Sequence, residues 1–353
     1  MTLLVWMLSA VVVPGFVNAQ NVDPLYIELN DGNLMPRVGF GTFNIEPRQV
    51  DKAIESALQN GYRHFDLAPK YGNEEAVGKA FKRLFAEGYD REQLFIATKL
   101  EPQVLRASDV SLAVEKTLRT LGIGYIDMYL IHVPFGFQRT PDLDWVRSEN
   151  GSFALDYSTD LVAVWRAMEN LVLAGRIRSI GLSNFNETQI SRIWNNSRIK
   201  PSNIQMEVNA YIQQQRFVEW CQEQGMVVTA YSPLGSRDTN RFRKKRHALA
   251  LSHTLPHMLD HPVVISMAHR YSRSPAQILL RYSYQRNIVV IPKSVNPKWI
   301  AENINIFDFY LRKSDMGQLR ALDQHGRYKK FDFSTLTGAR NHPEFPFVTR
   351  LAE

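Results

Sequence analysis

Phe95-Ile-Ala-Thr-Lys99 and Met128-Tyr-Leu-Ile-His132 are two short apolar runs, and Ser108–Leu121 between them follows a helical pattern. This order of strand, helix and strand is typical of a parallel β-sheet, because parallel strands need a long crossover connection. Each run ends in a polar side chain, Lys99 or His132, where a parallel strand would reach the carboxyl edge of its sheet. The segment therefore predicts a βαβ unit with two polar groups at one edge.

The same alternation continues along nearly the whole chain, without a Pro/Ser-rich linker or an internal repeat. It predicts an α/β protein with a single (β/α)8 TIM barrel over residues 20–353, beginning with an N-terminal β-hairpin. The predicted strands are Val38–Thr42, His64–Ala68, Phe95–Lys99, Met128–His132, Ser179–Ser183, Ile204–Val208, Val228–Ser232 and Val289–Pro292. The predicted helices include Gln49–Gln59, Glu74–Phe85, Ser108–Leu121, Asp160–Ala174 and Gln214–Gln224.

Two predicted connections are longer than ordinary loops, Pro134 to Ser158 and Ser236 to Pro262. Both follow strands, so we expect them on the carboxyl face of the barrel, where substrates bind. The dinucleotide fingerprint G-x-G-x-x-G is absent, since Gly39-Phe-Gly41 lacks the third glycine.

The composition is that of a globular protein with a large core. The 353 residues carry 42 Lys+Arg against 35 Asp+Glu, a formal net charge of +7, and 44% of them are hydrophobic. These values exclude disordered and collagen-like chains. Cys221 is the sole cysteine, so no intramolecular disulfide can form, and we interpret it as a buried apolar residue.

The basic character is concentrated in one segment. Arg237–Arg246 holds six positive side chains and one negative side chain, which is +5 of the net +7. The rest of the chain is close to neutral, and we expect no nucleic-acid partner. Three interpretations of the segment stay open: a solvated loop, a lid that attracts anions, and a processing site at Arg243-Lys-Lys-Arg246.

The first 19 residues resemble a secretory signal. They contain no charged side chain, Leu3 to Val13 form an apolar run, and Val17-Asn-Ala19 fits the small-x-small cleavage pattern. We expect cleavage after Ala19, secretion or residence in the secretory lumen, and no transmembrane span afterwards; an uncleaved signal anchor is the alternative. Three sequons are compatible with that route, at Asn150, Asn186 and Asn195.

Four polar side chains follow consecutive predicted strands: Asp66, Tyr71, Lys99 and His132. Barrel geometry would bring them to one mouth. A nearby ammonium would lower the pKa of Tyr71 and help it act as a general acid, with Asp66 holding Lys99 in place. His132 would donate a hydrogen bond to a carbonyl substrate. Taken singly, each residue also has an ordinary structural explanation, such as an ion pair or a lid aromatic.

The motifs that contain these residues resemble the aldo-keto reductase superfamily. They are Gly61-Tyr-Arg-His-Phe-Asp66-Leu-Ala-Pro-Lys-Tyr71-Gly-Asn-Glu74, Thr98-Lys99, Tyr129-Leu-Ile-His132, Gly181-Leu-Ser-Asn184-Phe and Ile291-Pro-Lys-Ser294. The resemblance runs from Tyr26 to Phe347. It implies an NADPH-dependent carbonyl reductase with the catalytic tetrad Asp66, Tyr71, Lys99 and His132, all of them present.

The resemblance also implies a cofactor site. Ser183, Asn184 and Gln205 would hold the nicotinamide carboxamide, and Tyr231 would stack on the ring. The pyrophosphate would lie at Ser232, Leu234 and Ser236. The remaining cofactor-binding positions, mostly around adenosine and its 2′-phosphate, would be Thr42, Lys293, Ser294, Val295, Asn296, Glu302 and Asn303.

Departures from the family pattern concern the cofactor and the substrate. Trp299 stands where an arginine is usual, so we expect a weaker NADPH preference, with NADH also possible. Phe43 and Val133 replace common tryptophans, which favours a bulky ketone or a steroid-like substrate. Glu101 stands where an aromatic is common, and it is interpreted either as a pocket residue or as a solvated rim charge.

We expect a monomer with a small-molecule carbonyl substrate and no bound metal. The alternative function is a secreted barrel that binds cofactor and acts as a carrier or interaction protein without significant turnover. A metal-dependent barrel hydrolase is a third option, but the strand ends carry no His/Asp cluster of the kind that binds a metal.

Overall fold

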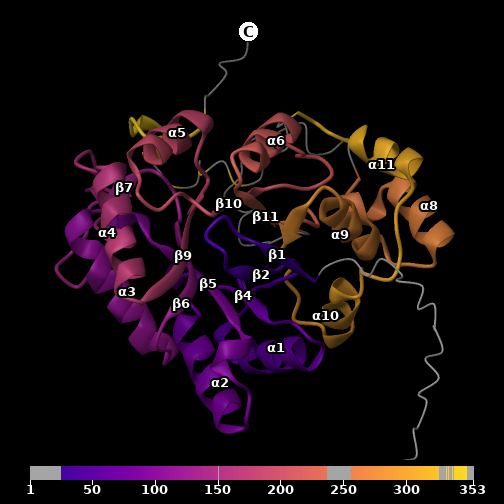
Figure 1. Ribbon diagram of the computed structural model, residues 1–353, viewed down its shortest axis with the longest axis horizontal. Coiled ribbons are helices and arrows are strands. Elements are labelled where there is room, and N and C mark those ends of the chain that lie inside the picture. The colour runs from indigo at the N-terminus through magenta and orange to yellow at the C-terminus, as the bar shows by residue number, and fades with distance from the viewer. Residues whose placement is uncertain are drawn as a thin grey trace, which may run out of the picture.

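The computed structural model describes residues 25–149, 151–236, 256–325, 331, 333, 336 and 338–347. Its centre is a sheet of eight parallel strands in the order β12-β11-β10-β9-β6-β5-β4-β3, and helices surround these strands (Figure 1). The strands of this sheet are β3 (Phe40–Gly41), β4 (His64–Asp66), β5 (Phe95–Leu100), β6 (Ile126–Ile131), β9 (Ile177–Ser183), β10 (Asn203–Glu207), β11 (Val227–Tyr231) and β12 (Ile288–Val290).

Backbone hydrogen bonds between the first and last strands close the sheet into a barrel. The N–H of Gly39 donates to the carbonyl of Val290 at 2.8 Å, and the N–H of Val290 donates to the carbonyl of Arg37 at 3.0 Å. Gly41 is required at this seam, because a Cβ there would lie 2.8 Å from the backbone oxygen of Ile291. The predicted (β/α)8 barrel is confirmed, and the eight predicted strands correspond to these eight.

Amphipathic helices cover the outside of the barrel. In α1 the buried positions Val50, Ala53, Ile54, Ala57 and Leu58 recur at helical spacing and face the sheet. The helices are α1 (Pro47–Gln59), α2 (Glu74–Ala86), α3 (Ala107–Leu121), α4 (Leu161–Leu173), α5 (Glu187–Asn196), α6 (Gln215–Glu223), α8 (Pro262–Tyr271), α9 (Pro275–Gln285), α10 (Pro297–Ile304) and α11 (Lys313–Arg320). None of the helices in the described part of the chain is long and apolar enough to cross a lipid bilayer.

A two-stranded hairpin closes the amino end of the barrel. Strands β1 (Tyr26–Glu28) and β2 (Leu34–Pro36) pair antiparallel, which confirms the predicted N-terminal hairpin. Leu29 and Met35 pack on the inward-facing Phe95 and Met128 at the base of the barrel. With this end filled, the polar side chains at the opposite ends of the strands form the open end of the barrel.

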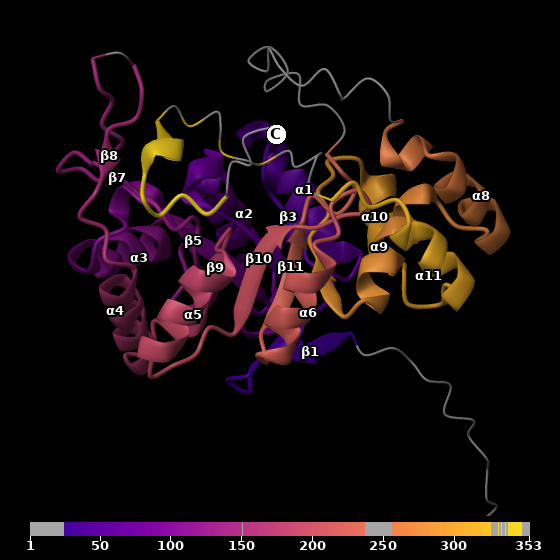
Figure 2. The same cartoon turned by 90° about the horizontal axis from the view of Figure 1, so that it is seen from above.

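The loop after β6 forms a second small hairpin at the carboxyl end. Strands β7 (Gly136–Phe137) and β8 (Leu155–Asp156) pair antiparallel within the first of the two long predicted connections. In Figure 2 this hairpin and β1 lie at opposite edges of the molecule. Arg139 from this loop donates two hydrogen bonds to the buried Asp109 of α3, at 2.5 and 2.7 Å, which ties the loop to the barrel wall.

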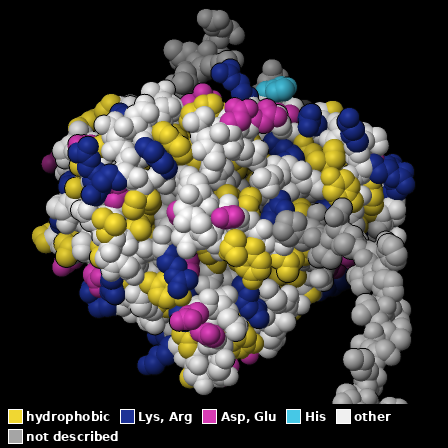
Figure 3. All heavy atoms as spheres, viewed as in Figure 1, with side chains coloured by type: hydrophobic (Ala, Val, Ile, Leu, Met, Phe, Trp, Pro, Cys, Tyr) yellow, Lys and Arg dark blue, Asp and Glu magenta, His cyan; other side chains and the backbone are white. Residues whose placement is uncertain are grey.

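The predictions on Cys221 and on the distribution of charge can be compared with the described residues. Cys221 is fully buried and free, as predicted, and burial raises the pKa of its thiol to about 12. On the face shown in Figure 3, Lys/Arg and Asp/Glu side chains are interspersed. The signal segment, the Asn150 sequon and the basic segment Arg237–Arg246 lie outside the described residues.

Candidate active site

A buried ion pair forms the base of the site. The Nζ atom of Lys99, at the end of β5, lies 2.8 and 2.9 Å from the two carboxylate oxygens of Asp66, at the end of β4. It also donates to the carbonyl of Leu67 at 2.8 Å. Both charged side chains are at most 3% exposed. Since the parallel register places the ends of β4 and β5 side by side, the fold brings together two residues that are 33 positions apart.

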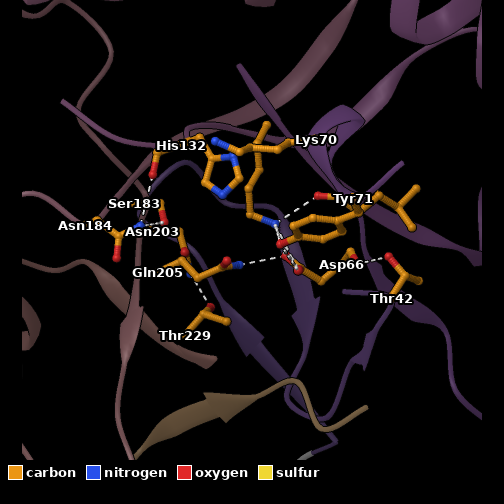
Figure 4. A network of polar contacts seen from close by, with 12 residues as sticks. Thr42, Asp66, Lys70, Tyr71, His132, Ser183, Asn184, Asn203, Gln205 and Thr229 are labelled. Carbon is orange, nitrogen blue, oxygen red and sulfur yellow. Dashed lines mark hydrogen bonds and ion pairs between the residues drawn. The ribbon is translucent and has the colours of Figure 1, made fainter. Parts of the chain in front are cut away.

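Tyr71 completes this group from the loop after β4. It ends the short 3-10 turn Pro69–Tyr71, which stops at the left-handed Gly72, with φ of 71°. Its hydroxyl lies 3.0 Å from Lys99 Nζ and 3.5 Å from Asp66 Oδ2. Figure 4 shows the Tyr71 hydroxyl and the Asp66 carboxylate turned toward the same point. A phenol, an ammonium and a carboxylate are thus within hydrogen-bonding reach of one another.

The expected lowering of the Tyr71 pKa is wrong. Burial of the hydroxyl, followed by the charges of Asp66 and Glu101, raises the pKa of Tyr71 well above its usual value of 10. The ammonium of Lys99 does not reverse this because its charge is compensated by the bidentate Asp66 carboxylate. Tyr71 is therefore a phenol throughout the neutral range, so it holds a proton that it can donate.

Asp66 is fixed by neighbours other than Lys99. Gln205, from β10, donates its amide to Asp66 Oδ1 at 2.7 Å. The hydroxyl of Thr42 donates to the backbone carbonyl of Asp66 at 2.8 Å. Two of the predicted cofactor-binding residues thus contact the acid–base group directly, a connection that the sequence pattern did not reveal.

His132 follows β6, and its ring centroid lies 6.1 Å from that of Tyr71. Its backbone carbonyl accepts a hydrogen bond from the Asn184 amide at 3.0 Å, and the same amide group donates to Ser183 Oγ at 2.9 Å. The Tyr231 hydroxyl donates to Asn184 Oδ1 at 2.8 Å. The ends of β6, β9 and β11 are therefore joined by one chain of hydrogen bonds, and Figure 4 shows the part that links His132, Asn184 and Ser183.

Glu101 is buried beside His132. Only 3% of its surface is exposed, so the interpretation as a solvated rim charge is wrong. Its Oε1 atom lies 3.1 Å from His132 Nδ1. The residue does lie next to the acid–base group, as the other interpretation expected, but its partner is the histidine.

Aromatic rings surround the open end of the site. Phe43 packs edge-on against Tyr71, with ring centroids 5.1 Å apart, and lies 6.0 Å from Phe331. Phe331 also packs edge-on against Tyr231 at 5.4 Å. Val133 is only 3% exposed and belongs to a cluster with Phe135, Phe137 and Ala339. The C-terminal segment thus contributes to this end, which the predicted site residues did not include.

The remaining predicted cofactor residues lie along β11, β12 and α10. The Ser232 and Ser236 hydroxyls are 2.8 Å apart, across a turn in which both residues and Gly235 have positive φ. Ser294 accepts a hydrogen bond from the N–H of Asn296, the residue that caps α10. The others are Leu234, which is partly buried, the exposed Lys293 and Val295, the partly buried Glu302 and the buried Asn303. Trp299 is 57% exposed on α10.

These residues fit a phosphorylated dinucleotide. The ends of β9 to β11 present neutral amides and hydroxyls, and the segment from Lys293 to Lys298 adds two exposed cations next to the N-terminus of α10. Helix N-termini and such turns provide N–H groups for phosphate oxygens. Among the described residues, no cluster of three or more His, Cys, Asp or Glu is arranged to hold a metal ion.

Fold and site together define an α/β-barrel oxidoreductase. The Aldo/keto reductase family model matches residues 37–324. Aldo-keto reductase family 1 member A1 of Cricetulus griseus is 41% identical over 325 residues, which cover 90% of this chain and 97% of that protein. The Homo sapiens protein of that name is 40% identical over 326 residues, with the same coverage.

A solved structure is also similar to this chain and belongs to the same class of oxidoreductase. The aldose reductase of Schistosoma japonicum has a TM-score of 0.80 at 38% identity, covering 92% of this chain and 99% of that one. The chain belongs to the aldo/keto reductase family. It is an NAD(P)H-dependent oxidoreductase that acts on carbonyl groups.

Proposed function

We propose that this enzyme reduces a bulky ketone or aldehyde to an alcohol with NADPH, and that Tyr71 donates the proton. The observation that carries the proposal is the position of Lys99 Nζ, which lies 2.8 Å from Asp66 Oδ1 and 3.0 Å from the Tyr71 hydroxyl. A phenol held against a buried, paired ammonium can release its proton to a developing alkoxide, because the ammonium stabilises the phenolate that forms.

Each residue of the group has a distinct task in this proposal. Tyr71 keeps its proton until the carbonyl oxygen becomes basic, consistent with its raised pKa. Lys99 donates a hydrogen bond to the Tyr71 oxygen, and Asp66 holds the ammonium in place. His132 donates a hydrogen bond to the carbonyl oxygen, which polarises the carbonyl group and positions its carbon.

The cofactor would be held by the residues at the carboxyl ends of β9 to β12. Ser183, Asn184 and Gln205 would bind the carboxamide, and Tyr231 would support the ring. Bound NADPH supplies a hydride to the carbonyl carbon. The phosphate-binding residues would be Ser232, Leu234, Ser236, Lys293, Ser294, Val295, Asn296, Glu302 and Asn303, with Thr42 beside Asp66.

Cofactor choice would be less strict than in relatives with an arginine at position 299. Trp299 can stack on adenine but has no charge to pair with a 2′-phosphate. Lys293, helped by Lys298, would then provide the positive charge, and Lys298 is 3.9 Å from Glu302 and highly exposed. We infer that the enzyme also accepts NADH.

Substrate size is inferred from the open end of the site. Phe43 stands beside Tyr71, where a larger indole is common, and Val133 is a small buried side chain in the cluster with Phe135 and Phe137. Both replacements leave more room for a substrate, so we propose a ketone with a ring system, such as a steroid. Glu101 is bound to His132 and is not part of the proposed substrate wall.

Replacement of Tyr71 by phenylalanine tests the proposed function. Loss of the general acid should lower kcat for carbonyl reduction by about 10²–10⁴-fold. Tyr310→Phe is the matched control, since it removes the same hydroxyl from a tyrosine that is 66% exposed; it should leave the rate unchanged. Equal and negligible turnover of an aldehyde and ketone panel by the wild type and Tyr71→Phe would instead favour a carrier function.

We also propose that the mature chain begins at residue 20, that residues 20–353 form one barrel domain, and that the enzyme is a secreted or lumenal monomer. Among the described sequons, Asn195 is exposed, whereas Asn186 caps α5 and donates to the carbonyl of Pro346. We therefore expect glycan on Asn195 rather than on Asn186. Intact-mass and glycopeptide analysis of protein secreted by eukaryotic cells would test both the cleavage site and this choice.

A further inference from the structure

Glu101 binds the ring nitrogen of His132 that faces away from the proposed substrate position. Its Oε1 atom lies 3.1 Å from His132 Nδ1 and accepts the backbone N–H of Lys70 at 3.2 Å. An oxygen approached by a second N–H donor is an acceptor, so the proton of this contact belongs to Nδ1 of the histidine. The carboxylate therefore fixes both the orientation of the ring and the protonation of one of its nitrogens.

This contact prevents a neutral His132 from donating a hydrogen bond to the substrate. A neutral imidazole carries one proton, and here it lies on Nδ1, which leaves Nε2 as a bare acceptor. A bare Nε2 would repel a carbonyl oxygen instead of donating to it. His132 can therefore act as a hydrogen-bond donor to the substrate only when both ring nitrogens carry protons.

We propose that Glu101 is a positioning residue that holds His132 as an imidazolium, so that Nε2–H donates a charged hydrogen bond to the substrate carbonyl. The inference rests on the proposed role of His132 and adds to it a specific protonation state. The buried carboxylate, next to the ring, stabilises the positive charge. A neutral side chain at this position could not do so.

Glu101 itself is negatively charged at neutral pH. Its burial alone raises its pKa, but the charge and hydrogen bond of His132 and the contacts with Lys70 outweigh burial, so the pKa of Glu101 lies below its usual 4.5. The ammonium of Lys70 lies 4.2 Å from the Trp145 ring centroid. Glu101 is thus a carboxylate, not a carboxylic acid, at neutral pH.

Other titratable groups face this pair from the surrounding elements. On the substrate side are the Tyr71 phenol and the neutralised Asp66–Lys99 pair. Behind Glu101 lies Glu74 of α2, whose pKa is raised to about 7, first by burial and then by the charge of Glu101. The pKa of the buried Tyr129 is raised well above 10 by burial and by both glutamates. Of these groups, Glu74 is the one that could also titrate near neutrality.

The pH dependence of reduction tests the proposal. In the wild type, kcat/KM should fall about tenfold per pH unit once the imidazolium loses its proton. In Glu101→Gln the amide oxygen still accepts the N–H of Lys70 and the proton of Nδ1, but it carries no negative charge to stabilise the imidazolium. The fall should therefore begin at a lower pH in this variant than in the wild type, so that its kcat/KM at neutral pH is about tenfold or more below the wild-type value.

Glu74→Gln is the matched control. It removes the neighbouring carboxylate without touching His132, and its profile should keep the wild-type fall. A profile in which the fall keeps its wild-type position in Glu101→Gln but moves or disappears in Glu74→Gln would overturn the proposal, because the fall would then report the titration of Glu74. A wild-type profile without any fall up to the point where the protein unfolds would overturn it as well.

A spectroscopic measurement gives an independent result. In ¹⁵N-histidine-labelled protein at neutral pH, both nitrogens of His132 should have shifts of protonated nitrogens, and Glu101→Gln should change one of them to the unprotonated type. The resonances are assigned by their loss in His132→Gln. Far-UV circular dichroism confirms that each variant is folded. One unprotonated nitrogen in the wild type would contradict the imidazolium.

Failure of this inference can be distinguished from failure of the proposed function. If Tyr71→Phe and His132→Gln both abolish reduction while Glu101→Gln keeps the wild-type pH profile, the function stands and the role of Glu101 is refuted. If Tyr71→Phe and His132→Gln reduce carbonyls at the wild-type rate, the proposed function itself fails, and this inference fails with it.

Discussion

The ammonium of Lys99 lies 2.8 and 2.9 Å from both carboxylate oxygens of Asp66, in a pair whose side chains are at most 3% exposed. The same ammonium lies 3.0 Å from the Tyr71 hydroxyl. One buried ion pair therefore holds the group that we propose as the proton donor. Removing either charge would leave the other uncompensated inside the barrel.

The first prediction concerns the stability of this pair. Asp66→Ala leaves the Lys99 charge buried without its partner and should lower the free energy of unfolding by about 3–5 kcal/mol. The double variant Asp66→Ala/Lys99→Met should lose less than the sum of the two single variants, because it buries no unpaired charge. Urea unfolding monitored by tryptophan fluorescence measures all four proteins. Additive losses would show that the two charges do not depend on each other.

The second prediction concerns the Tyr71 proton. Because the pKa of Tyr71 lies well above 10, the phenol form predominates at every lower pH. Alcohol oxidation requires the phenolate, so its rate should rise about tenfold per pH unit up to about pH 10. Reduction should not decline through Tyr71 in this range, and a decline that Glu101→Gln moves to lower pH is assigned to His132. A plateau of oxidation near neutral pH would contradict the raised pKa.

The barrel could be predicted from sequence because its signal is long and regular. Strands buried on both faces read as continuous apolar runs, as in β5 and β6, where every residue is buried. The four polar residues of the site could be predicted as well, since the carboxyl ends of consecutive parallel strands must lie at one end of a barrel. A position along a strand is enough for these inferences.

Properties that depend on the surroundings of a side chain could not be predicted in the same way. The direction of the Tyr71 pKa shift follows from burial and from the compensation of the Lys99 charge by Asp66. Neither property can be predicted from the spacing of these residues in the sequence. The burial of Glu101 depends on its packing against His132, 31 residues away in the chain. For the same reason, Phe331 was not foreseen as a neighbour of Phe43 and Tyr231.

The third prediction concerns the loop that carries β7 and β8. Arg139 binds both carboxylate oxygens of Asp109, and the Asp109 side chain is 1% exposed. Arg139→Ala removes these charged hydrogen bonds from a buried carboxylate, which should cost about 1.5–3 kcal/mol of unfolding free energy. Limited proteolysis should then cut the loop faster.

Arg147→Ala in the same loop is the control, because the contacts of the Arg147 side chain with described residues are an exposed bond to the Gly151 carbonyl and a contact with the Phe153 ring. Equal cleavage of the two variants would mean that the Arg139–Asp109 contact does not fasten the loop.

The fourth prediction concerns Trp299 and the choice between NADPH and NADH. Trp299 is 57% exposed on α10, on the helix that begins after Asn296, and has no charge for a phosphate. Trp299→Arg introduces a guanidinium that can form a charged, bidentate hydrogen bond with a 2′-phosphate. The ratio of kcat/KM for NADPH to that for NADH should rise by about tenfold or more, since such bonds contribute about 1.5–3 kcal/mol.

The control for this change separates charge from stacking. Trp299→Ala removes the indole without adding charge, so it should weaken binding of both cofactors by a similar factor and leave their ratio unchanged. Fluorescence titration with NADP⁺ and NAD⁺ measures the two affinities directly, apart from turnover. If Trp299→Arg leaves the ratio at the wild-type value, residue 299 does not contact the 2′-phosphate. Lys293 would then account for the NADPH preference on its own, and Lys293→Met should remove it.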